Sequence, residues 1–384
     1  MAGLKKNLDS LQETARERTV KTQNIEYDLE TLVKRVKSKS IQLNPDYQRR
    51  HRWSDEVSSR LIESLLLNIP IPAIFISQDI DVDEETEAEV SRYTVIDGQQ
   101  RLTAIFEFMT GQLRLTGLEI LKEINDCNYK ELPPFLLRRL EERTVKCLRI
   151  DSTIDPQVKY DIFERLNTGS IKLEAQELRN AVARGKFNDA IKELSKFSVF
   201  REMLQISEND ANSNAKVKKM EDVELVLRFF ALRNGGYKIS RKSGFKDFLT
   251  ETLVDLNKLD ETEIVQMKRE FKICMLTIYA NLGKYAFSKH RVEGGVSIKR
   301  MSTFNAAVYD AIAVGFAEVH DLKAMAQDFD FKISNPDNTE SNIITEHMTY
   351  SLFEDSGFFE SVSGSVNDVG KIVYRVNAVV ELLT

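Results

Sequence analysis

Apolar residues recur at helical spacing in three segments of the first half of the chain. In SDEVSSRLIESLLLN one stripe contains Val57, Leu61 and Leu65, and Ser54 followed by two acids is typical of a helix N-terminus. From Leu102 onward, apolar residues fall at positions i, i+3, i+4 and i+7 and predict a second helix. A third helix is predicted to open at DPQVKYDIFERLN, because aspartate followed by proline suits a first turn.

Short runs of β-branched residues lie between these helices. Strands are predicted at AIFIS (73–77), RYTVID (92–97) and TVKCLRI (144–150). The segment DIDVDEETEAE (79–89), between the first two strands, contains seven acids and is typical of a solvated loop. Up to about residue 184 the pattern therefore predicts a mixed α/β domain.

The helical period continues through almost all of the second half, after the polar stretch SENDANSNAKVKK (207–219). Apolar residues at helical spacing include Ile264, Phe271, Ile278, Leu282 and Tyr285, followed by Met301, Phe304, Val308 and Ile312. A helical bundle accommodates this pattern best. The C-terminal segment GKIVYRVNAVVELL fits a strand or a helix equally well.

The length of the chain indicates more than one domain. Its 384 residues exceed the usual size of a single domain, and an apolar content of 42% is sufficient for large cores. The expected fold class is α+β. We expect an N-terminal helical extension (1–24), a mixed α/β domain (25–205) and an all-helical C-terminal domain (206–384).

The composition of the chain indicates its cellular compartment and the state of its cysteines. No stretch approaches the roughly 18 consecutive apolar residues of a membrane span, and the N-terminus is polar where a signal peptide would be apolar. We therefore expect a cytoplasmic protein without membrane contact. Cys127, Cys147 and Cys274 lie far apart in sequence, which predicts reduced thiols and neither disulfides nor a zinc site.

The net charge of −6 argues against a uniformly basic nucleic-acid surface, but not against local basic patches. One such patch is NPDYQRRHRW (44–53), which contains three arginines, a histidine, a tyrosine and a tryptophan. Cations for phosphates and rings for stacking suit a binding loop. An ordinary surface turn, with Trp53 packed inward, is the alternative.

The segment TVIDGQQRLTAIFEF (94–108) joins a predicted strand directly to a predicted helix. A helix N-terminus presents unpaired N–H groups and the positive end of the helix dipole, and a glycine such as Gly98 lets the backbone approach a ligand closely. Arg101 adds a forked cation suited to phosphate, and Gln99 and Gln100 can hydrogen-bond a base, a sugar or water. Asp97 could bind a metal ion, orient water or simply cap the helix.

A third polar segment, IFERLNTGSIKLEAQELRNA (162–181), places Asn-Thr-Gly in a tight loop between two helices. Arg165 precedes this loop, and Glu177, Arg179 and Asn180 follow it. Such a concentration of polar side chains around one turn favours a functional loop.

Together these three segments resemble the signature blocks of a known family. The blocks around NPDYQRRHRW, VIDGQQRLTAIFEF and FERLNTGSIKLEAQELRNA look like those of the N-terminal domain of GmrSD-type modification-dependent restriction systems, over roughly residues 25–200. That family belongs to the wider ParB and sulfiredoxin-like group. The resemblance implies a mixed α/β fold whose DGQQR turn binds a nucleoside triphosphate and, in restriction members, supports its hydrolysis.

The resemblance also implies particular site residues. It assigns the turn as the centre of the site, with Asp97, Gln100 and Arg101 as candidate catalytic groups and Asp97 as a candidate ligand of Mg²⁺. Candidate nucleotide ligands come from all three segments: Tyr47, Gln48, Arg49, Gly98, Gln99, Arg165, Asn167, Thr168, Gly169 and Arg179.

One departure from the family concerns DNA cutting. The restriction enzymes carry an HNH-type nuclease domain, which needs a histidine in a local D-H or H-H context. His51, His290, His320 and His347 are isolated, and His290 is expected at a basic helix end followed by a turn at its glycines. We therefore expect this chain to lack such a domain.

Three hypotheses follow from these observations. The favoured one is a nucleotide-binding and nucleoside triphosphate-hydrolysing component of a prokaryotic anti-phage restriction system. The second is a ParB-like module that binds or cleaves DNA through the same basic pocket. The third is a regulatory protein that docks a separately encoded effector, with assembly into a homo-oligomer as a further expectation.

Overall fold

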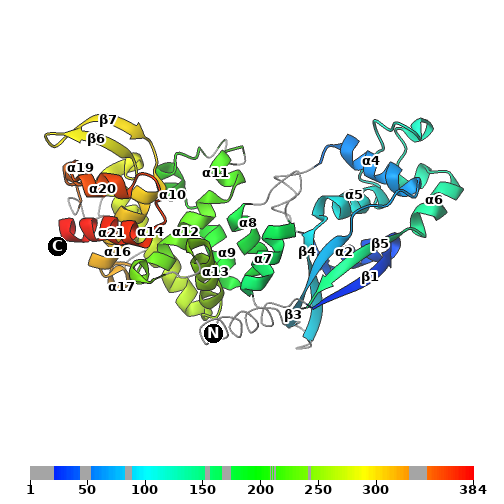
Figure 1. Cartoon of the computed structure of the whole chain (residues 1–384), viewed down its shortest axis with the longest axis horizontal. Coiled ribbons are helices and arrows are strands. Elements are labelled where there is room, and N and C mark those ends of the chain that lie inside the picture. The colour runs from blue at the N-terminus through cyan, green and yellow to red at the C-terminus, as the bar shows by residue number, and fades with distance from the viewer. Residues whose placement is uncertain are drawn as a thin grey trace, which may run out of the picture. The chain divides into compact units, whose positions relative to one another are not determined.

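The computed structural model divides the chain into two compact units, residues 1–173 and 174–384 (Figure 1). It describes residues 21–43, 53–82, 89–151, 156–166, 174–207, 209, 211, 213–240, 244–327 and 344–384. Most of the predicted N-terminal extension and the loop predicted at 331–342 lie outside these residues. The predicted domain limits stay predictions, although helices just before residue 205 pack within the core of the second unit.

A five-stranded mixed sheet organises the first unit, in the order β1-β5-β3-β4-β2. Pairs β1·β5 and β3·β4 are antiparallel, whereas β3·β5 and β2·β4 are parallel. The three predicted strands are confirmed, and the structure adds the two edge strands. The acidic segment 79–89 is not wholly a loop as predicted, because β3 continues to Val82 and β4 begins at Glu89. The bounds are β1 Thr22–Asp28, β2 Ile41–Gln42, β3 Ile74–Val82, β4 Glu89–Asp97 and β5 Thr144–Ile150.

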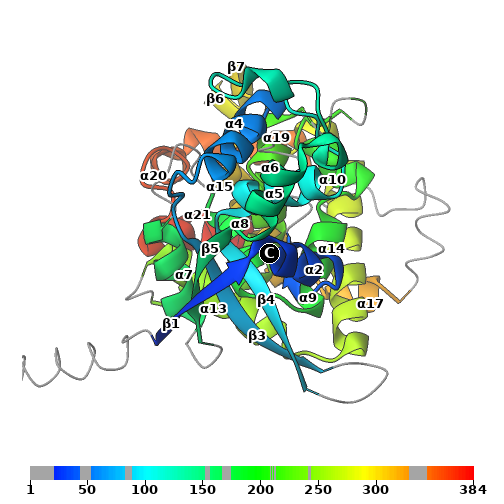
Figure 2. The same ribbon diagram turned by 90° about the vertical axis from the view of Figure 1, so that its right-hand side faces the viewer.

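Four helices share one hydrophobic core with this sheet (Figure 2). They are α2 Leu29–Lys37, α4 Asp55–Leu66, α5 Gln99–Met109 and α6 Pro134–Glu141. A fifth helix, α7 (Pro156–Leu166), lies against β4 and begins at the predicted proline. Helix α5 ends at Met109, just before Gly111, which adopts a positive φ of 79° as expected near a helix C-terminus.

Helix α4 is confirmed, but its apolar stripe does not coincide fully with its buried face. Ser54 caps the helix by accepting a hydrogen bond from the Val57 amide at 3.3 Å, as predicted. Val57 itself is 45% exposed. The buried face is shifted by one residue, because α4 packs through Ser58, Ser59, Ile62, Glu63, Leu65 and Leu66.

The buried Glu63 explains part of this shift. Its carboxylate accepts hydrogen bonds from the backbone amides of Ile120 (2.8 Å) and Leu121 (2.7 Å), with Glu119 at 3.4 Å. Burial raises the pKa of the Glu63 carboxyl, but these amides outweigh burial and hold the pKa below its usual value. Glu63, although charged, therefore lies in the buried face of α4, where it binds the backbone of residues 119–121.

The second unit is largely helical, as predicted, and the C-terminal segment is a helix (Figure 1). None of the described helices in either unit is long and apolar enough to cross a membrane. The bounds are α8 Ala175–Val182, α9 Lys186–Leu194, α10 Ser198–Met203, α11 Ala215–Lys218, α12 Glu221–Leu232, α13 Phe245–Leu256, α14 Glu261–Leu282, α15 Ala306–Tyr309, η5 Asp310–Val314, α16 Gly315–Val319, α17 Leu322–Met325, α19 Glu346–Glu354, α20 Ser356–Ser361 and α21 Val369–Leu383.

The expectation that this half is entirely helical is wrong at one place. Residues 289–302 form an antiparallel hairpin of β6 (Lys289–Glu293) and β7 (Val296–Ser302), joined by the predicted turn at Gly294 and Gly295. His290 therefore lies on a strand, and Met301 does not continue a helix. Lysine, valine, serine and isoleucine alternate here with a period that suits strands, and the two glycines suit a hairpin turn.

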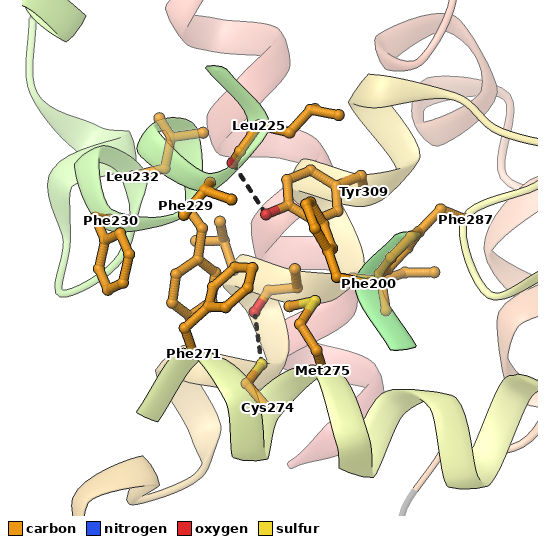
Figure 3. Packing of buried hydrophobic residues seen from close by; sticks show 14 of the residues in the cluster. Phe200, Leu225, Phe229, Phe230, Leu232, Phe271, Cys274, Met275, Phe287 and Tyr309 are labelled. Carbon is orange, nitrogen blue, oxygen red and sulfur yellow. Dashed lines mark hydrogen bonds between the residues drawn. The ribbon is translucent and has the colours of Figure 1, made fainter. Parts of the chain in front are cut away.

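Aromatic residues from distant helices form the core of the second unit (Figure 3). Phe271 on α14 meets Phe200 and Phe229 edge to face, with ring centroids 5.2 and 5.3 Å apart. The Tyr309 hydroxyl donates to the Leu225 carbonyl at 3.0 Å, and the Cys274 thiol lies 3.8 Å from the Ala313 carbonyl. These two contacts pair the polar atoms of Tyr309 and Cys274 inside an otherwise apolar core.

A buried ion network crosses the same unit. Asp310, at the start of a single turn of π-helix, is fully buried between the guanidinium groups of Arg228 and Arg375. Arg228 Nε donates to Asp310 Oδ1 at 3.0 Å, and Arg375 Nη2 donates to Oδ2 at 2.6 Å. Buried charges are tolerated only when they are paired and hydrogen-bonded in this way.

Candidate functional site

The DGQQR turn is built where β4 gives way to α5. β4 ends at Asp97, Gly98 adopts a left-handed φ of 92°, and α5 begins at Gln99. A Cβ at Gly98 would lie 3.1 Å from the Ile74 side chain and 3.3 Å from the Arg101 guanidinium. Both the φ value and the close approach therefore require glycine here. Because Gly98 has no side chain, α5 also begins without a side-chain cap.

Arg101 braces this turn from inside. Its Nη2 donates to Asp97 Oδ2 at 2.7 Å, and its Nη1 donates to the carbonyls of Pro72 and, at 3.2 Å, Ala73. The Arg101 side chain is only 11% exposed. One guanidinium thus joins the end of β4, the segment that enters β3 and the first turn of α5.

Gln100 connects the turn to the first polar segment. Its Oε1 accepts a hydrogen bond from the Trp53 amide at 3.1 Å. Its Nε2 is buried and has no hydrogen-bond partner among the described residues. Since a buried donor without an acceptor is costly, this amide marks a place where an acceptor from a ligand or from water would be favoured. Gln99 is also buried.

The remaining candidate residues divide into three groups. Tyr47, Gln48 and Arg49, and likewise Asn167, Thr168 and Gly169, lie outside the described residues. Arg165 is exposed near the end of α7, the helix that lies against β4. Arg179 belongs to the second unit, where it is buried.

Arg179 already has partners inside the second unit. Its Nη1 donates to Glu224 at 2.7 Å and to Gln176 at 2.9 Å. The structure therefore brings Asp97, Gly98, Gln100 and Arg101 together, and it gives Arg179 a role in packing α8 against α12.

Sequence reasoning missed the groups that fix this turn from a distance. The carbonyls of Pro72 and Ala73 carry no side-chain signal, and the Trp53–Gln100 bond joins residues 47 positions apart. The IPIP segment (69–72) gives only an indirect clue, because proline has no backbone N–H and interrupts regular hydrogen bonding before the strand begins.

A cavity of about 440 Å³ borders α5 beyond the turn. Thr103, which lies one helical turn after Gln99 on the same face, is one of its lining residues. The other lining residues come from α2, α5, the segment just after α5 and the neighbourhood of β2: Val36, Lys39, Ile41, Gln42, Leu43, Phe106, Glu107 and Gln112. Its volume is in the range of small-molecule sites.

Over the described ranges no three His, Cys, Asp or Glu side chains gather as a set of metal ligands. The three cysteines are free, and burial raises the pKa of the Cys147 thiol to about 11. A thiol with such a pKa stays protonated near neutral pH and is a poor nucleophile.

The sheet, the left-handed glycine and the uncapped helix define a mixed α/β domain built around a strand-to-helix turn. Residues 29–183, which contain all three polar segments, match the model of the family described as GmrSD restriction endonuclease, N-terminal domain. These residues are therefore a domain of that family, and the protein is a component of a GmrSD-type restriction system. Comparisons with curated proteins and with solved structures found no match.

Proposed function

We propose that the DGQQR turn of this restriction-system component binds and hydrolyses a nucleoside triphosphate. The observation that carries the proposal is an uncapped helix N-terminus beside the buried Gln100 amide, whose Nε2 has no acceptor among the described residues. Helix N-termini with a preceding glycine are suited to phosphate, because the amides and the helix dipole both favour negative charge.

The turn assigns separate tasks to its residues. Phosphate oxygens would lie on the amides of the first turn of α5, and Gln100 Nε2 would donate to a phosphate oxygen or to the attacking water. Arg101 would hold the turn in shape through the contacts described above and add positive charge behind it. Such preorganised donors are favourable because they need no rearrangement during the reaction.

Asp97 is the residue that fits Mg²⁺ or water. Its side chain is 43% exposed, and its Oδ2 accepts the Arg101 hydrogen bond. The second carboxylate oxygen, Oδ1, would be the one that binds the ion or the water. A bound Mg²⁺ would neutralise charge on the phosphates. In the absence of an ion, the same carboxylate would orient a water molecule.

Further ligands would come from the other two segments and from the cavity. We propose Tyr47, Gln48, Arg49 and Arg165, together with Asn167, Thr168 and Gly169, as further ligands of the nucleotide. The cavity beside α5 would take the base, because it combines apolar walls with polar groups. Arg179 is the weakest of these assignments, since Glu224 and Gln176 already bind its guanidinium.

Phosphate release and ligand-induced thermal stabilisation test the proposal. Purified protein would be incubated with each of the common nucleoside triphosphates, with and without Mg²⁺. Gln100→Leu, which removes the unpartnered amide, should weaken binding about 10- to 150-fold, because a charge-assisted hydrogen bond contributes about 1.5–3 kcal/mol. Gln23→Leu on the exposed part of β1 is the matched control. If no triphosphate releases phosphate and none stabilises the protein, this function is excluded.

The proposal also covers how DNA would be cut. We propose that the HNH activity comes from outside these 384 residues, from an effector that this protein regulates in the cytoplasm. The support is that two of the three described histidines have other contacts: His290 bonds Ser297 at 2.7 Å within the hairpin, and the His320 ring packs at a tilt against Phe316. Co-purification of a tagged protein with the products of its genomic neighbours would identify such an effector, and size measurement would reveal any homo-oligomer.

A further inference from the structure

The hairpin β6–β7 carries an unusual arrangement of charge. Across the two strands Arg291 lies directly opposite Lys299, and His290 lies opposite Arg300. Directly opposite residues of an antiparallel pair have Cβ atoms about 5 Å apart, and like charges in this position destabilise a sheet. Residues 289–302 contain four Lys and Arg but one carboxylate, in a chain whose net charge is −6.

The charges of Arg291 and Lys299 are not neutralised by an ion pair within the described part of the chain. Arg291 and Lys299 are both exposed, and among the described residues neither forms an ion pair. Two nearby acids serve other groups: Glu354 binds the Gly295 amide, and Glu346 lies beside Arg300 and Tyr350 in the contact with α19. Glu293, the carboxylate of the hairpin itself, is exposed opposite Val296 and forms no ion pair with Arg291 or Lys299 among the described residues. Within the described part of the chain, no ion pair therefore relieves the repulsion between Arg291 and Lys299.

Apolar residues of the same hairpin are also exposed. Val296, Ile298 and Met301 are 63%, 53% and 45% exposed, and all three lie on β7 within six residues. His290, on the other side of the hairpin, packs against Tyr350 and Phe353 of α19. One side is thus fixed to the unit, while cations and apolar groups remain uncovered on the rest. Figure 1 shows the hairpin at the margin of this unit.

We infer that this hairpin is an arm that contacts duplex DNA, with Arg291 and Lys299 binding backbone phosphates. Repulsion between two adjacent cations is locally unfavourable, and the phosphates of a polyanion would neutralise it. Such locally unfavourable arrangements are concentrated at functional sites. Two strands about 4.8 Å apart form a ribbon that enters a major groove roughly 12 Å wide. Exposed aliphatic side chains suit contacts with thymine methyl groups and sugars.

An acidic protein is a less suitable occupant than DNA. The outer surface of a ribbon whose longer strand has seven residues measures roughly 24 by 10 Å, or about 240 Å². Stable protein interfaces cover about 800 Å² on each partner. The hairpin alone is therefore too small for a stable protein interface, but two phosphate contacts need no such area. This inference does not depend on nucleotide binding at the DGQQR turn.

The test is the salt dependence of DNA binding, measured without nucleotide. Arg291→Gln with Lys299→Gln should lower affinity for a 30-base-pair duplex roughly 10- to 100-fold near 0.1 M salt. The slope of log affinity against log salt should fall in magnitude by about 2, since each phosphate contact contributes about 0.9. Lys196→Gln with Lys323→Gln removes the same charge from exposed positions elsewhere in the unit and is the matched control.

The outcomes separate the inference from its competitors. Affinity and slope lost only in the hairpin variant would support it, and Arg291→Lys with Lys299→Arg should retain both. An equal loss in the matched control, wild-type binding in the hairpin variant, or no DNA binding by the wild type would overturn it. Loss of a co-purified protein with unchanged DNA binding would also overturn it and identify the arm as a protein contact.

The melting temperature of the hairpin variant gives a second readout. Because the variant removes repulsion between opposite cations, it should melt at the same temperature as the wild type or higher. A clearly lower melting temperature would show that Arg291 and Lys299 stabilise the fold, and it would contradict the inference.

Discussion

Replacement of Arg101 by alanine should loosen the DGQQR turn without unfolding the second unit. The ion pair with Asp97 is partly exposed, so it contributes at most about 1 kcal/mol. Arg101 also donates to the carbonyls of Pro72, which is exposed, and Ala73, which is partly buried. Hydrogen bonds from a charged donor contribute about 1.5–3 kcal/mol each, and the exposed one belongs at the lower end of that range. With partial relaxation of the loop, the expected loss is roughly 2–4 kcal/mol in the first unit.

Urea unfolding followed by tryptophan fluorescence measures this loss locally, because Trp53 is the only tryptophan and its amide bonds Gln100. With a typical slope of 1–3 kcal/mol per molar urea, the midpoint should fall by about 1–2 M. Arg101→Lys should lose less, since an ammonium group keeps the charge but cannot bridge three acceptors in a plane. Arg60→Ala, which removes an exposed pair with Glu119, is the control and should shift the midpoint little. A midpoint for Arg101→Ala within about 0.2 M of wild type would refute the bracing role.

Three further substitutions test other parts of the structure. Gly98→Ala should cost roughly 1–3 kcal/mol and weaken triphosphate binding, because alanine at a φ of 92° is strained and its Cβ would press on Arg101; equal binding and stability in this variant would contradict that account. Asp310→Asn should cost about 3–5 kcal/mol by leaving Arg228 and Arg375 buried without a counter-charge, as measured by thermal unfolding of the second unit. Glu63→Gln should cost about 1–3 kcal/mol at neutral pH. Because the folded pKa of Glu63 lies below its unfolded value, its stabilisation is present above the unfolded pKa and is lost as pH falls through the folded pKa, so the variant should show a weaker acid dependence below about pH 4.5.

Local sequence patterns were sufficient to predict the elements that carry the turn. The runs AIFIS, RYTVID and TVKCLRI are rich in β-branched and aromatic residues. They form the first part of β3, the last part of β4 and all of β5, which are the three interior strands of the sheet. The edge strands were missed, because β1 is largely polar and β2 has only two residues. Edge strands bury little surface, so their sequences carry a weak periodic signal.

The hairpin was missed for a different reason. The apolar residues Met301 and Phe304 happen to continue a helical spacing into α15, although Met301 lies on β7. Two adjacent glycines between short runs with alternating residues were the available signal for a hairpin. Weighing that signal above the spacing of single apolar residues would have predicted β6 and β7.

The candidate site was predictable in its chemistry but not in its internal contacts. Gly98 followed by a helix is a local pattern, and its left-handed conformation follows from the lack of a side chain. The partners of Arg101 and Gln100 come from residues 28 and 47 positions away, respectively, and only tertiary packing brings them there. Sequence suggested that Arg101 faces phosphate directly, whereas the structure directs it mainly toward Asp97 and two carbonyls.

The most direct test is a crystal structure of the protein with Mg²⁺ and a non-hydrolysable nucleoside triphosphate. The proposed function predicts phosphate oxygens about 3 Å from the amides at the start of α5 and from Gln100 Nε2. A triphosphate bound elsewhere, with the first turn of α5 unoccupied, would contradict it.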